Sequence, residues 1–408
     1  MINGVRSAAL ISLERIEKSK KYSNLEIDAA IKKYNFTDID RSFFTVLVYG
    51  VIQRRITLDY FIAQFSNKPM NKIDLTVLQI LRLGLYQIMF MDKVPNSAAC
   101  DESVKLCRMN GYTSASGFVN AILRNACRNE LIYPNLSVKH SCPEWLCMMW
   151  TEQFGTETAE KLLECINIPP DITLRVNTLK ITRDEIKGKK TEVSPFGIKV
   201  VTIPEFDGSF FIQDEASQLC CLMSGAKEGE TVIDVCASPG GKSFSCAMQM
   251  NNKGRIISCD LHKLSLVDKT AELLGIKIIE TRQIDGTVFN HEFENIADLV
   301  LCDVPCSGLG VIAKKPEIRY KTEDEISTLP ALQYSILNNS SRYVKDGGRV
   351  VYSTCTLNIA ENENVVKRFM ESHGNFTILE ERTLLPCYDN TDGFYIAVLT
   401  KRNACDII

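Results

Sequence analysis

The 408-residue chain lacks the sequence features of secreted and membrane proteins. Its first residues contain no apolar run of signal-peptide length, so we expect no secretory leader. The most apolar helical stretch, Val77 to Met91, is too short to span a bilayer and carries Arg82. These absences exclude membrane-spanning function classes and predict a cytoplasmic protein with no membrane partner.

Histidine is also scarce, and metal-binding spacings are missing. The four histidines form no ligand-spaced pair, and none of the 16 cysteines belongs to a Cys-x-x-Cys motif. We therefore expect no metal site. A chain of this length buries its own cores without a disulfide framework. We interpret the cysteines as reduced thiols, mostly small buried side chains, in a reducing compartment.

A strong excess of positive charge is absent too, since the net charge is −3. The distribution is uneven, however: residues 1–145 contain 19 lysines and arginines against 13 acids, and the remainder contains 28 against 37. A basic front part on an acidic back part suits an RNA-holding module joined to a cofactor-binding one. Chance asymmetry on solvated surfaces explains the same numbers.

The pattern of apolar residues divides the chain into three parts. Residues 1–133 predict an all-α domain, because apolar residues recur at three- and four-residue steps. The predicted helices are Ser7–Ile16, Asp40–Ile52, Leu58–Phe65, Asp74–Phe90, Ala98–Met109 and Ser116–Arg128, with Asp40 and Asp74 as N-caps. Residues 134–225 predict a small α+β subdomain, with one helix over Trp145–Cys165 and strands at Ile172–Val176, Ile198–Ile203 and Phe210–Gln213.

Residues 226–402 alternate strands and helices, which predicts an α/β fold with a doubly wound, Rossmann-like sheet. The expected strands are Thr231–Cys236, Arg255–Asp260, Lys277–Gln283, Ala297–Asp303 and Arg349–Cys355, followed by an antiparallel pair at Phe376–Glu380 and Gly393–Thr400. In such a sheet ligands bind outside the carboxyl ends of the strands. The residues that end each strand are therefore the candidates for a site.

The first strand ends in a glycine-rich turn, Asp234-Val-Cys-Ala-Ser-Pro-Gly-Gly-Lys-Ser243. Glycines let the backbone approach a ligand, and the following helix N-terminus favours a carboxylate or phosphate. A Walker A loop is one reading, but Cys236 occupies the place of its first glycine. A nucleoside-binding turn of the methyltransferase type is the other.

Two acids follow the next strands. Asp260 ends the second strand, where a carboxylate can accept both ribose hydroxyls of a nucleoside. Asp285 follows the third strand and could accept from an adenine amino group. A helix-capping role for Asp260 and a turn role for Asp285 are the structural alternatives. Together the two acids and the glycine turn predict a nucleoside pocket.

The last two candidate residues for the site are cysteines. The fourth strand ends in Asp303-Val-Pro-Cys-Ser-Gly308 and the fifth in Ser353-Thr-Cys-Thr356. As ends of neighbouring strands, Cys306 and Cys355 could face one crevice. A thiolate that adds to C6 of cytosine turns the ring into an enamine, whose C5 can attack an electrophilic methyl group. Two thiols beside a nucleoside pocket therefore suggest covalent cytosine methylation.

Two other function classes remain open from the residues alone. A P-loop-like nucleotide hydrolase is disfavoured by Cys236 and by the missing Mg²⁺-binding acidic pattern. A non-catalytic RNA-binding or assembly factor with the same fold is disfavoured by the presence of both cysteines with Asp303.

The motifs resemble those of the RNA (cytosine-5)-methyltransferase family, and the likeness covers nearly the whole chain. Its carriers are the glycine turn, the Pro-Cys and Thr-Cys strand ends, and the flanking motifs Leu174-Arg-Val-Asn-Thr178, Gln213-Asp-Glu-Ala-Ser217 and Asp392-Gly-Phe-Tyr395. The first 133 residues are similar to the RNA-binding domain of the antitermination factor NusB, at Asp40–Phe44, Val48–Val51, Leu81–Gln87 and Phe118–Arg124. This front domain points to the bacterial members that act on 16S ribosomal RNA.

The resemblance implies roles for individual residues. It makes Cys355 the nucleophile and gives Cys306 the task of helping to break the covalent adduct. It places S-adenosylmethionine against Ala237, Ser238, Pro239, Gly240, Gly241, Lys242, Asp260, Asp285 and Asp303. It also suggests that Lys242 and Asp303 contact the target cytosine. Ser238 replaces an alanine of many relatives, which is a minor departure.

The expected partner is 16S ribosomal RNA, bound by a monomer. The target base has to lie in a loop or be extruded, because a stacked base cannot present C6 to a thiol. We expect phosphate contacts from Arg54, Arg55, Arg124, Arg128, Lys314, Lys315 and Arg319. The segment Lys314–Tyr320 departs from the family pattern but keeps its basic and aromatic character.

Overall fold

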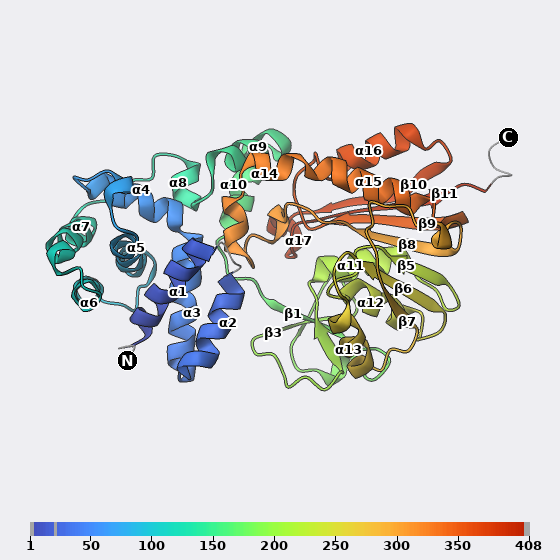
Figure 1. Cartoon of the computed structure of the whole chain (residues 1–408), viewed down its shortest axis with the longest axis horizontal. Helices are drawn as coiled ribbons and strands as arrows, with labels where there is room; N and C mark the ends of the chain where they lie inside the picture. The colour runs from blue at the N-terminus through green and yellow to red at the C-terminus, as the bar shows by residue number, and fades with distance from the viewer. Residues whose placement is uncertain (1–3, 20–22, 404–408) are drawn as a thin grey trace. The chain divides into compact units, whose positions relative to one another are not determined.

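The computed structural model describes residues 4–19 and 23–403, which form two compact units (Figure 1). The first unit contains the chain up to Ile168 together with the later segment Ile312–Tyr320. The second unit contains Pro169–Val311 and the chain from Lys321 onward. This division falls between Ile168 and Pro169, inside the predicted subdomain 134–225. The organisation into three domains stays a prediction.

The first unit is helical, as predicted for its front part. Apolar residues spaced three and four apart place one face of each helix up to Arg128 in a shared core, which includes Phe44, Leu58, Leu81 and Leu123. The helices are α1 (Val5–Ser19), α2 (Ser23–Tyr34), α3 (Asp38–Gln53), α4 (Arg55–Phe65), α5 (Leu75–Phe90), α6 (Asn96–Met109), α7 (Ser116–Arg128), α8 (Leu136–His140), α9 (Glu144–Phe154) and α10 (Thr156–Cys165).

Helix ends account for two errors of sequence reading. Asp74 caps α5 as predicted, because its side chain accepts the Thr76 N–H. Asp40 is not a cap: Thr37 holds that position, and its hydroxyl accepts the N–H of Asp40. The single helix predicted over Trp145–Cys165 is wrong, since Gly155, with φ 79° and ψ 160°, breaks it into α9 and α10.

The segment Ile312–Tyr320 is anchored in the first unit by Arg319. This side chain is 0% exposed. Its Nη1 donates to the carbonyl oxygens of Gln53 at 2.8 Å and Ser141 at 2.9 Å, and its Nη2 donates to that of Ile166 at 3.0 Å. The guanidinium therefore donates hydrogen bonds to backbone carbonyl oxygens from three separate segments of the first unit. The prediction that Arg319 contacts RNA phosphate is wrong, because the side chain is enclosed and already engaged.

A four-stranded antiparallel sheet begins the second unit, in the order β2-β3-β1-β4. Its strands are β1 (Ile172–Val176), β2 (Lys189–Lys190), β3 (Gly197–Val200) and β4 (Phe210–Ile212). Helix α11 (Glu215–Ser224) follows, capped by the Asp214 side chain. Gln213 joins this region to α12 (Gly241–Gln249), because its Oε1 accepts the Ser245 hydroxyl at 2.9 Å.

The large sheet confirms the predicted doubly wound architecture. Its strand order is β10-β11-β9-β8-β5-β6-β7, with β9, β8, β5, β6 and β7 parallel and the last two strands of the chain antiparallel. The strands are β5 (Thr231–Asp234), β6 (Arg255–Asp260), β7 (Ile279–Gln283), β8 (Ala297–Asp303), β9 (Val344–Thr354), β10 (Phe376–Leu384) and β11 (Phe394–Lys401).

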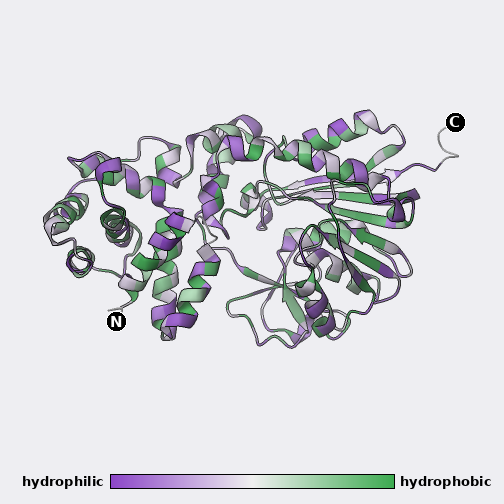
Figure 2. Ribbon diagram, viewed as in Figure 1, coloured by the Kyte–Doolittle hydropathy of each residue, from purple (hydrophilic) through white to green (hydrophobic). Residues whose placement is uncertain are grey.

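Helices cover both faces of this sheet. Neighbouring strand residues point to opposite sides, so Val232 packs with α11, α12 and α13 (Ser265–Leu274) while Ile233 packs with α15 (Leu329–Ser341) and α16 (Glu363–Ser372). Figure 2 shows hydrophobic residues along the strands of this sheet. A sheet buried on both faces explains why its strands read as continuous apolar runs.

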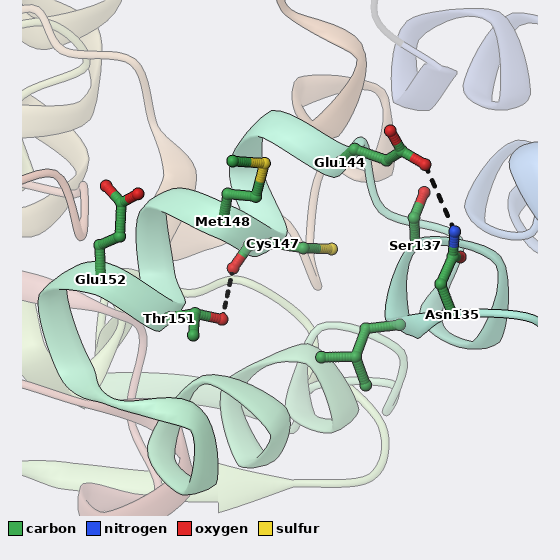
Figure 3. Close-up of a pocket in the computed structure, with 8 residues that line it drawn as sticks. Asn135, Ser137, Glu144, Cys147, Met148, Thr151 and Glu152 are labelled. Carbon is green, nitrogen blue, oxygen red and sulfur yellow. Dashed lines mark hydrogen bonds between the residues drawn. The ribbon is translucent and has the colours of Figure 1, made fainter.

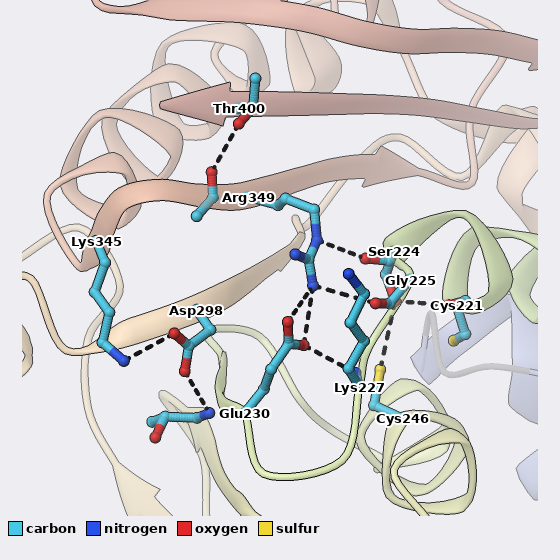
Figure 4. A network of polar contacts seen from close by, with 12 residues as sticks. Cys221, Ser224, Gly225, Lys227, Glu230, Cys246, Asp298, Lys345, Arg349 and Thr400 are labelled. Atoms are coloured by element: carbon cyan, nitrogen blue, oxygen red, sulfur yellow. Dashed lines mark hydrogen bonds and ion pairs between the residues drawn. The ribbon is translucent and has the colours of Figure 1, made fainter. Parts of the chain in front are cut away.

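Ion pairs fix the amino ends of the parallel strands (Figure 4). Arg349 on β9 donates to both carboxylate oxygens of Glu230 at 2.9 Å and to the Ser224 carbonyl at 3.0 Å. Asp298 on β8 accepts the Thr231 N–H and the Lys345 ammonium, each at 2.8 Å. These contacts stabilise one edge of the sheet and leave the carboxyl edge to the loops that carry the site residues.

Across residues 4–19 and 23–403, no helix combines the length and the apolar character that crossing a membrane requires.

Replacing Arg319 should destabilise the first unit. We expect Arg319→Met to lower the free energy of unfolding by about 3 kcal/mol, because buried carbonyls lose their donors. The exposed Arg128→Met is the control and should change it by less than about 0.5 kcal/mol. Urea unfolding followed by far-UV circular dichroism measures both. Equal stability of the two variants would show that the carbonyls find other donors.

Candidate active site

The candidate site lies at the carboxyl edge of β5, β8 and β9, which are neighbours in the order β9-β8-β5. Asp303 at the end of β8 pairs in register with Ser353 of β9, and Asp234 ends β5 beside Leu301. Because the three strands are parallel, their following loops emerge at the same edge. These loops carry most of the residues that the sequence singled out.

The glycine turn leads directly from β5 into α12. Gly240 has φ 109°, a conformation that favours glycine, and a Cβ there would lie 2.3 Å from the Phe244 ring. No side chain caps the N-terminus of α12. The first N–H groups of this helix are therefore available to an anionic group, as expected for the carboxylate of an amino-acid-like ligand.

Asp234, at the start of the turn, is buried. Its Oδ2 accepts the Ser243 hydroxyl at 2.7 Å, and Ser243 in turn accepts from Ser258 at 2.7 Å. Burial raises the pKa of Asp234 to about 7. Its Oδ1 has no hydrogen-bond partner among the described residues. Sequence reasoning assigned Asp234 no role.

Asp260 lies opposite the glycine turn, at the end of β6. Its Oδ2 accepts the Ser238 N–H and its Oδ1 accepts the His262 N–H, both at 3.0 Å. Asp285 is exposed and accepts the N–H and hydroxyl of Thr287, and the hydroxyl bond is the main cause that lowers the pKa of Asp285. Asp285 therefore takes the turn role that was its structural alternative. Asp260 instead connects two strand-end loops, and each of its oxygens keeps a lone pair that can accept a further hydrogen bond.

The buried Lys242 and the half-buried Asp303 form an ion pair between the glycine turn and β8. The Lys242 Nζ lies 2.5 Å from the Asp303 Oδ2, and Lys242 is 8% exposed. The other Asp303 oxygen accepts the Ser353 hydroxyl at 2.8 Å. Burial by itself lowers the pKa of Lys242, but the Asp303 carboxylate together with the neighbouring Cys220 and Cys221 raises that pKa above its usual value. Lys242 is consequently charged at neutral pH.

The two thiols lie next to this ion pair. The Sγ atoms of Cys306 and Cys355 are 3.4 Å apart, and both side chains are half-buried. A hydrogen bond from the Cys306 thiol is the main cause that lowers the pKa of Cys355, and the nearby Lys242 ammonium lowers it further. The same hydrogen bond raises the pKa of Cys306. Of the two thiols, Cys355 is therefore the more acidic.

Backbone contacts hold the loop of Cys355. The Gly310 N–H donates to the Cys355 carbonyl at 3.0 Å, and the Gly393 N–H donates to the Gly310 carbonyl at 2.9 Å. A Cβ on Gly310 would lie 1.9 Å from the Gly393 oxygen, so only glycine fits there. Phe394, next in the chain, places its ring centroid 5.1 Å from the Lys242 ammonium. The flanking motif Asp392–Tyr395 therefore supports the site through its backbone.

The predicted RNA-binding residues are in different environments within the first unit. Arg124 and Arg128 are exposed on α7. Arg54 is half-buried over the Phe90 ring, and Arg55 stacks over Tyr320 at 3.6 Å. Lys315 is exposed and Lys314 is half-buried, both in the segment that precedes Arg319. Except for Arg319, each of these side chains has some exposed surface.

Sequence reasoning missed the polar residues after Cys355. Asn358, Glu361 and Asn362 are all buried and bind the loops of both cysteines. The sequence signal for them is the clustering of three amide and acid side chains within seven residues of Cys355. Polar side chains of this kind are ordinarily exposed to solvent, so their spacing does not predict burial.

A separate hollow of about 420 Å³ lies in the first unit, between α8 and α9 (Figure 3). Leu136, Cys147 and Met148 line it, and Asn135 donates to Glu144 at its rim at 3.3 Å. None of the predicted catalytic, cofactor or RNA-binding residues lines this hollow.

Comparisons with known proteins agree with this geometry. A model of the family described as 16S rRNA methyltransferase RsmB/F matches residues 222–400. A NusB family model matches residues 3–128, and a model described as the RsmF/B-like ferredoxin-like domain matches residues 142–193.

Relatives match over nearly the full length. The probable ribosomal RNA small subunit methyltransferase B of Bacillus subtilis is 37% identical, over 98% of this chain and 99% of that protein. Its counterpart in Synechocystis is 34% identical, over 97% and 99%. The crystal structure of PH0851 superposes with a TM-score of 0.82 at 25% identity, over 96% of this chain and 98% of that one.

A second solved structure, NSun6 from Pyrococcus horikoshii with SFG, shares the fold with a TM-score of 0.57 at 22% identity, over 64% of this chain and 98% of that one. The strand-end thiols, the glycine turn and the full-length relatives agree with one another, and this chain belongs to the RsmB/F family of 16S rRNA methyltransferases.

Proposed function

We propose that the protein transfers a methyl group from S-adenosylmethionine to C5 of a cytosine in 16S ribosomal RNA, with Cys355 as covalent catalyst. The observation that supports this most directly is the thiol pair, 3.4 Å apart, beside the Lys242–Asp303 ion pair. The names of the full-length relatives support the substrate class.

The chemistry needs a thiolate because C5 of cytosine is a poor nucleophile. Cys355 adds to C6, which makes C5 electron-rich enough to take the methyl group that the bound cofactor supplies. A base then removes the C5 proton, and the electron pair of that C–H bond re-forms the C5–C6 double bond while the C6–S bond breaks and Cys355 leaves as a thiolate. We assign Cys306 to this last stage, where its thiol helps to break the adduct.

Asp303 and Lys242 suit recognition of the base. The Asp303 carboxylate accepts a hydrogen bond from the exocyclic amine of cytosine, whereas uracil presents an acceptor at the same place. Lys242 pairs with Asp303 at 2.5 Å and lowers the pKa of Cys355. Selection of cytosine and activation of the nucleophile thus depend on the same ion pair.

The residues of the glycine turn suit the cofactor. The uncapped N-terminus of α12 can bind the carboxylate of its methionine part, and Asp260 can accept from its ribose hydroxyls. We propose that Ala237, Ser238, Pro239, Gly240 and Gly241 form the backbone surface of that site, with Asp285 beside the adenine.

We assign RNA binding to the basic surface of residues 1–133, helped by the subdomain 134–225, and catalysis to residues 226–402. Arg54, Arg55, Arg124, Arg128, Lys314 and Lys315 are the proposed phosphate contacts.

The two cysteines should respond differently to replacement. With radiolabelled S-adenosylmethionine and unmodified 16S ribosomal RNA, Cys355→Ala should lose methyl transfer by a factor on the order of 10³ or more and form no adduct. Cys306→Ala should instead accumulate a covalent protein–RNA complex, visible as a slow band on a denaturing gel. The buried Cys302→Ala is the matched control. An adduct on Cys306 in the Cys355→Ala variant would reverse the assignment.

Asp260 should contribute to cofactor affinity. We expect Asp260→Asn to weaken S-adenosylmethionine binding by about 10- to 100-fold, because two charge-assisted hydrogen bonds to the ribose weaken. Asp268→Asn, on α13 and bonded to Thr281, is the control and should leave the affinity unchanged. Calorimetric titration measures both, and equal affinities would remove Asp260 from the cofactor site.

RNA binding should weaken steeply with salt. Each lost phosphate contact reduces the slope of log affinity against log salt by about 0.7 for single-stranded RNA. The double variant Arg124→Gln/Arg128→Gln should therefore lower the slope by about 1.4, which filter binding between roughly 50 and 200 mM salt can measure. Lys253→Gln, exposed and paired with Glu228, should leave it unchanged. If the double variant had the same salt slope as the unaltered protein, Arg124 and Arg128 would not be phosphate contacts.

A further inference from the structure

Glu361 is a buried carboxylate that connects the loops of both active-site cysteines. Its side chain is 0% exposed. Its Oε2 accepts the Ser307 N–H at 2.8 Å and the Gln333 Nε2 at 2.9 Å, and its Oε1 accepts the Asn358 Nδ2 at 2.9 Å. Ser307 follows Cys306, and Asn358 lies three residues after Cys355. One side chain thus spans the two loops.

The Cys306 loop is held on both sides of the cysteine. Gln333, which binds Glu361, also donates to the Pro305 carbonyl at 2.9 Å. Ser307 is fixed at its N–H by Glu361, at its carbonyl by the Lys321 ammonium at 2.8 Å, and at its hydroxyl by Thr356 at 2.6 Å. Without Glu361, Gln333 loses an acceptor and the Ser307 N–H becomes an unpaired buried donor.

The Cys355 loop is held by the same polar cluster. Asn362 binds the residues on either side of the cysteine: its Oδ1 accepts the Thr354 hydroxyl at 2.5 Å, and its Nδ2 donates to the Thr356 carbonyl at 2.9 Å. Glu361 itself holds this loop through Asn358. The two cysteine loops are therefore joined in two ways: directly, by the hydroxyls of Ser307 and Thr356, and through the Glu361 carboxylate.

The chemistry of Glu361 favours a positioning role over a purely stabilising one. A buried carboxylate is costly to desolvate and is tolerated only when its oxygens are hydrogen-bonded. The three donors are neutral groups, so Glu361 gains no compensating ion pair from them. A network of this kind fixes one geometry, because every alternative leaves a buried polar group unpaired.

We propose that Glu361 is a positioning residue that sets the separation of Cys306 and Cys355. The proposal rests on the function given above, since it assumes that the two thiols act together. It also predicts that the effect of Glu361 on the pKa of Cys355 is transmitted by the Cys306 hydrogen bond, whereas Asn358 links Glu361 to the backbone of the Cys355 loop.

The charge environment of Cys355 makes this influence measurable. The groups that act on its thiol are the Cys306 thiol, the Asp303 carboxylate, the Lys242 ammonium and Asp392. The Cys306 hydrogen bond is the largest of the effects that lower the pKa of Cys355. A displaced Cys306 should therefore make Cys355 less reactive at neutral pH, even in the absence of RNA.

The first experiment is the pH dependence of Cys355 alkylation by iodoacetamide, read by mass spectrometry of the peptide that contains it. We expect Glu361→Gln to reduce the alkylation rate near neutral pH by about tenfold, which corresponds to a shift of about one pH unit. In a Cys306→Ala background the same substitution should have no further effect. Glu363→Gln is the matched control, because Glu363 binds Thr383 on β10.

The second measurement is turnover on 16S ribosomal RNA. Glu361→Gln should lower kcat by about 100-fold, as expected for a small misplacement of a reacting group, with KM changed less than about twofold. Glu361→Asp keeps the charge but is one methylene shorter, so it should behave like Glu361→Gln. It serves as the second variant if the glutamine variant melts at a much lower temperature.

Three results would overturn the proposal: an unchanged alkylation rate, the same loss of rate in the Cys306→Ala background, or a change in KM alone. The alkylation experiment needs neither RNA nor methyl donor. If the unaltered protein methylated no cytosine, the proposed function would fail, while the alkylation result would still decide the role of Glu361.

Discussion

The ion pair of the buried Lys242 with the half-buried Asp303 is the interaction on which the candidate site depends. It joins the first turn of α12 to the end of β8, and Asp303 binds Ser353 of β9 as well. Three neighbouring elements therefore meet at one charge pair. Desolvating the Lys242 ammonium is costly, and removing Asp303 would leave that ammonium without its charged partner in the interior. Packing alone would be better served by apolar residues, so the pair is best understood through what it does to its neighbours.

Those neighbours are the proposed base-recognition position and the proposed nucleophile. The Lys242 ammonium lowers the pKa of Cys355. Cys306 adds the larger effect through its hydrogen bond. The candidate site thus combines two pairs of side chains. The Lys242–Asp303 ion pair sets the local electrostatic field, and the two thiols have a separation that depends on the polar cluster around Glu361.

The sequence predicted the parallel core and the residues at its strand ends, because buried parallel strands read as apolar runs and end in polar loops. It predicted that Cys306 and Cys355 lie at neighbouring strand ends, which the register of Asp303 with Ser353 confirms. It did not predict the roles of Glu361 or Arg319, because burial of a charged residue depends on donors or acceptors far away in the chain. It also missed α2, where only Ser23, Ile27 and Ala30 are buried and the apolar signal is weak.

The discontinuous first unit has a consequence for biosynthesis. The ribosome synthesises α1 to α10 early. The carbonyls of Gln53, Ser141 and Ile166 gain their hydrogen-bond donor only when Arg319 emerges, after β5, β6, β7 and β8 have been made. The helical unit cannot reach its final form while it is the only part of the chain outside the ribosome. Strand β9 and Cys355 follow later still. The order of translation therefore makes completion of the first unit precede assembly of the thiol pair.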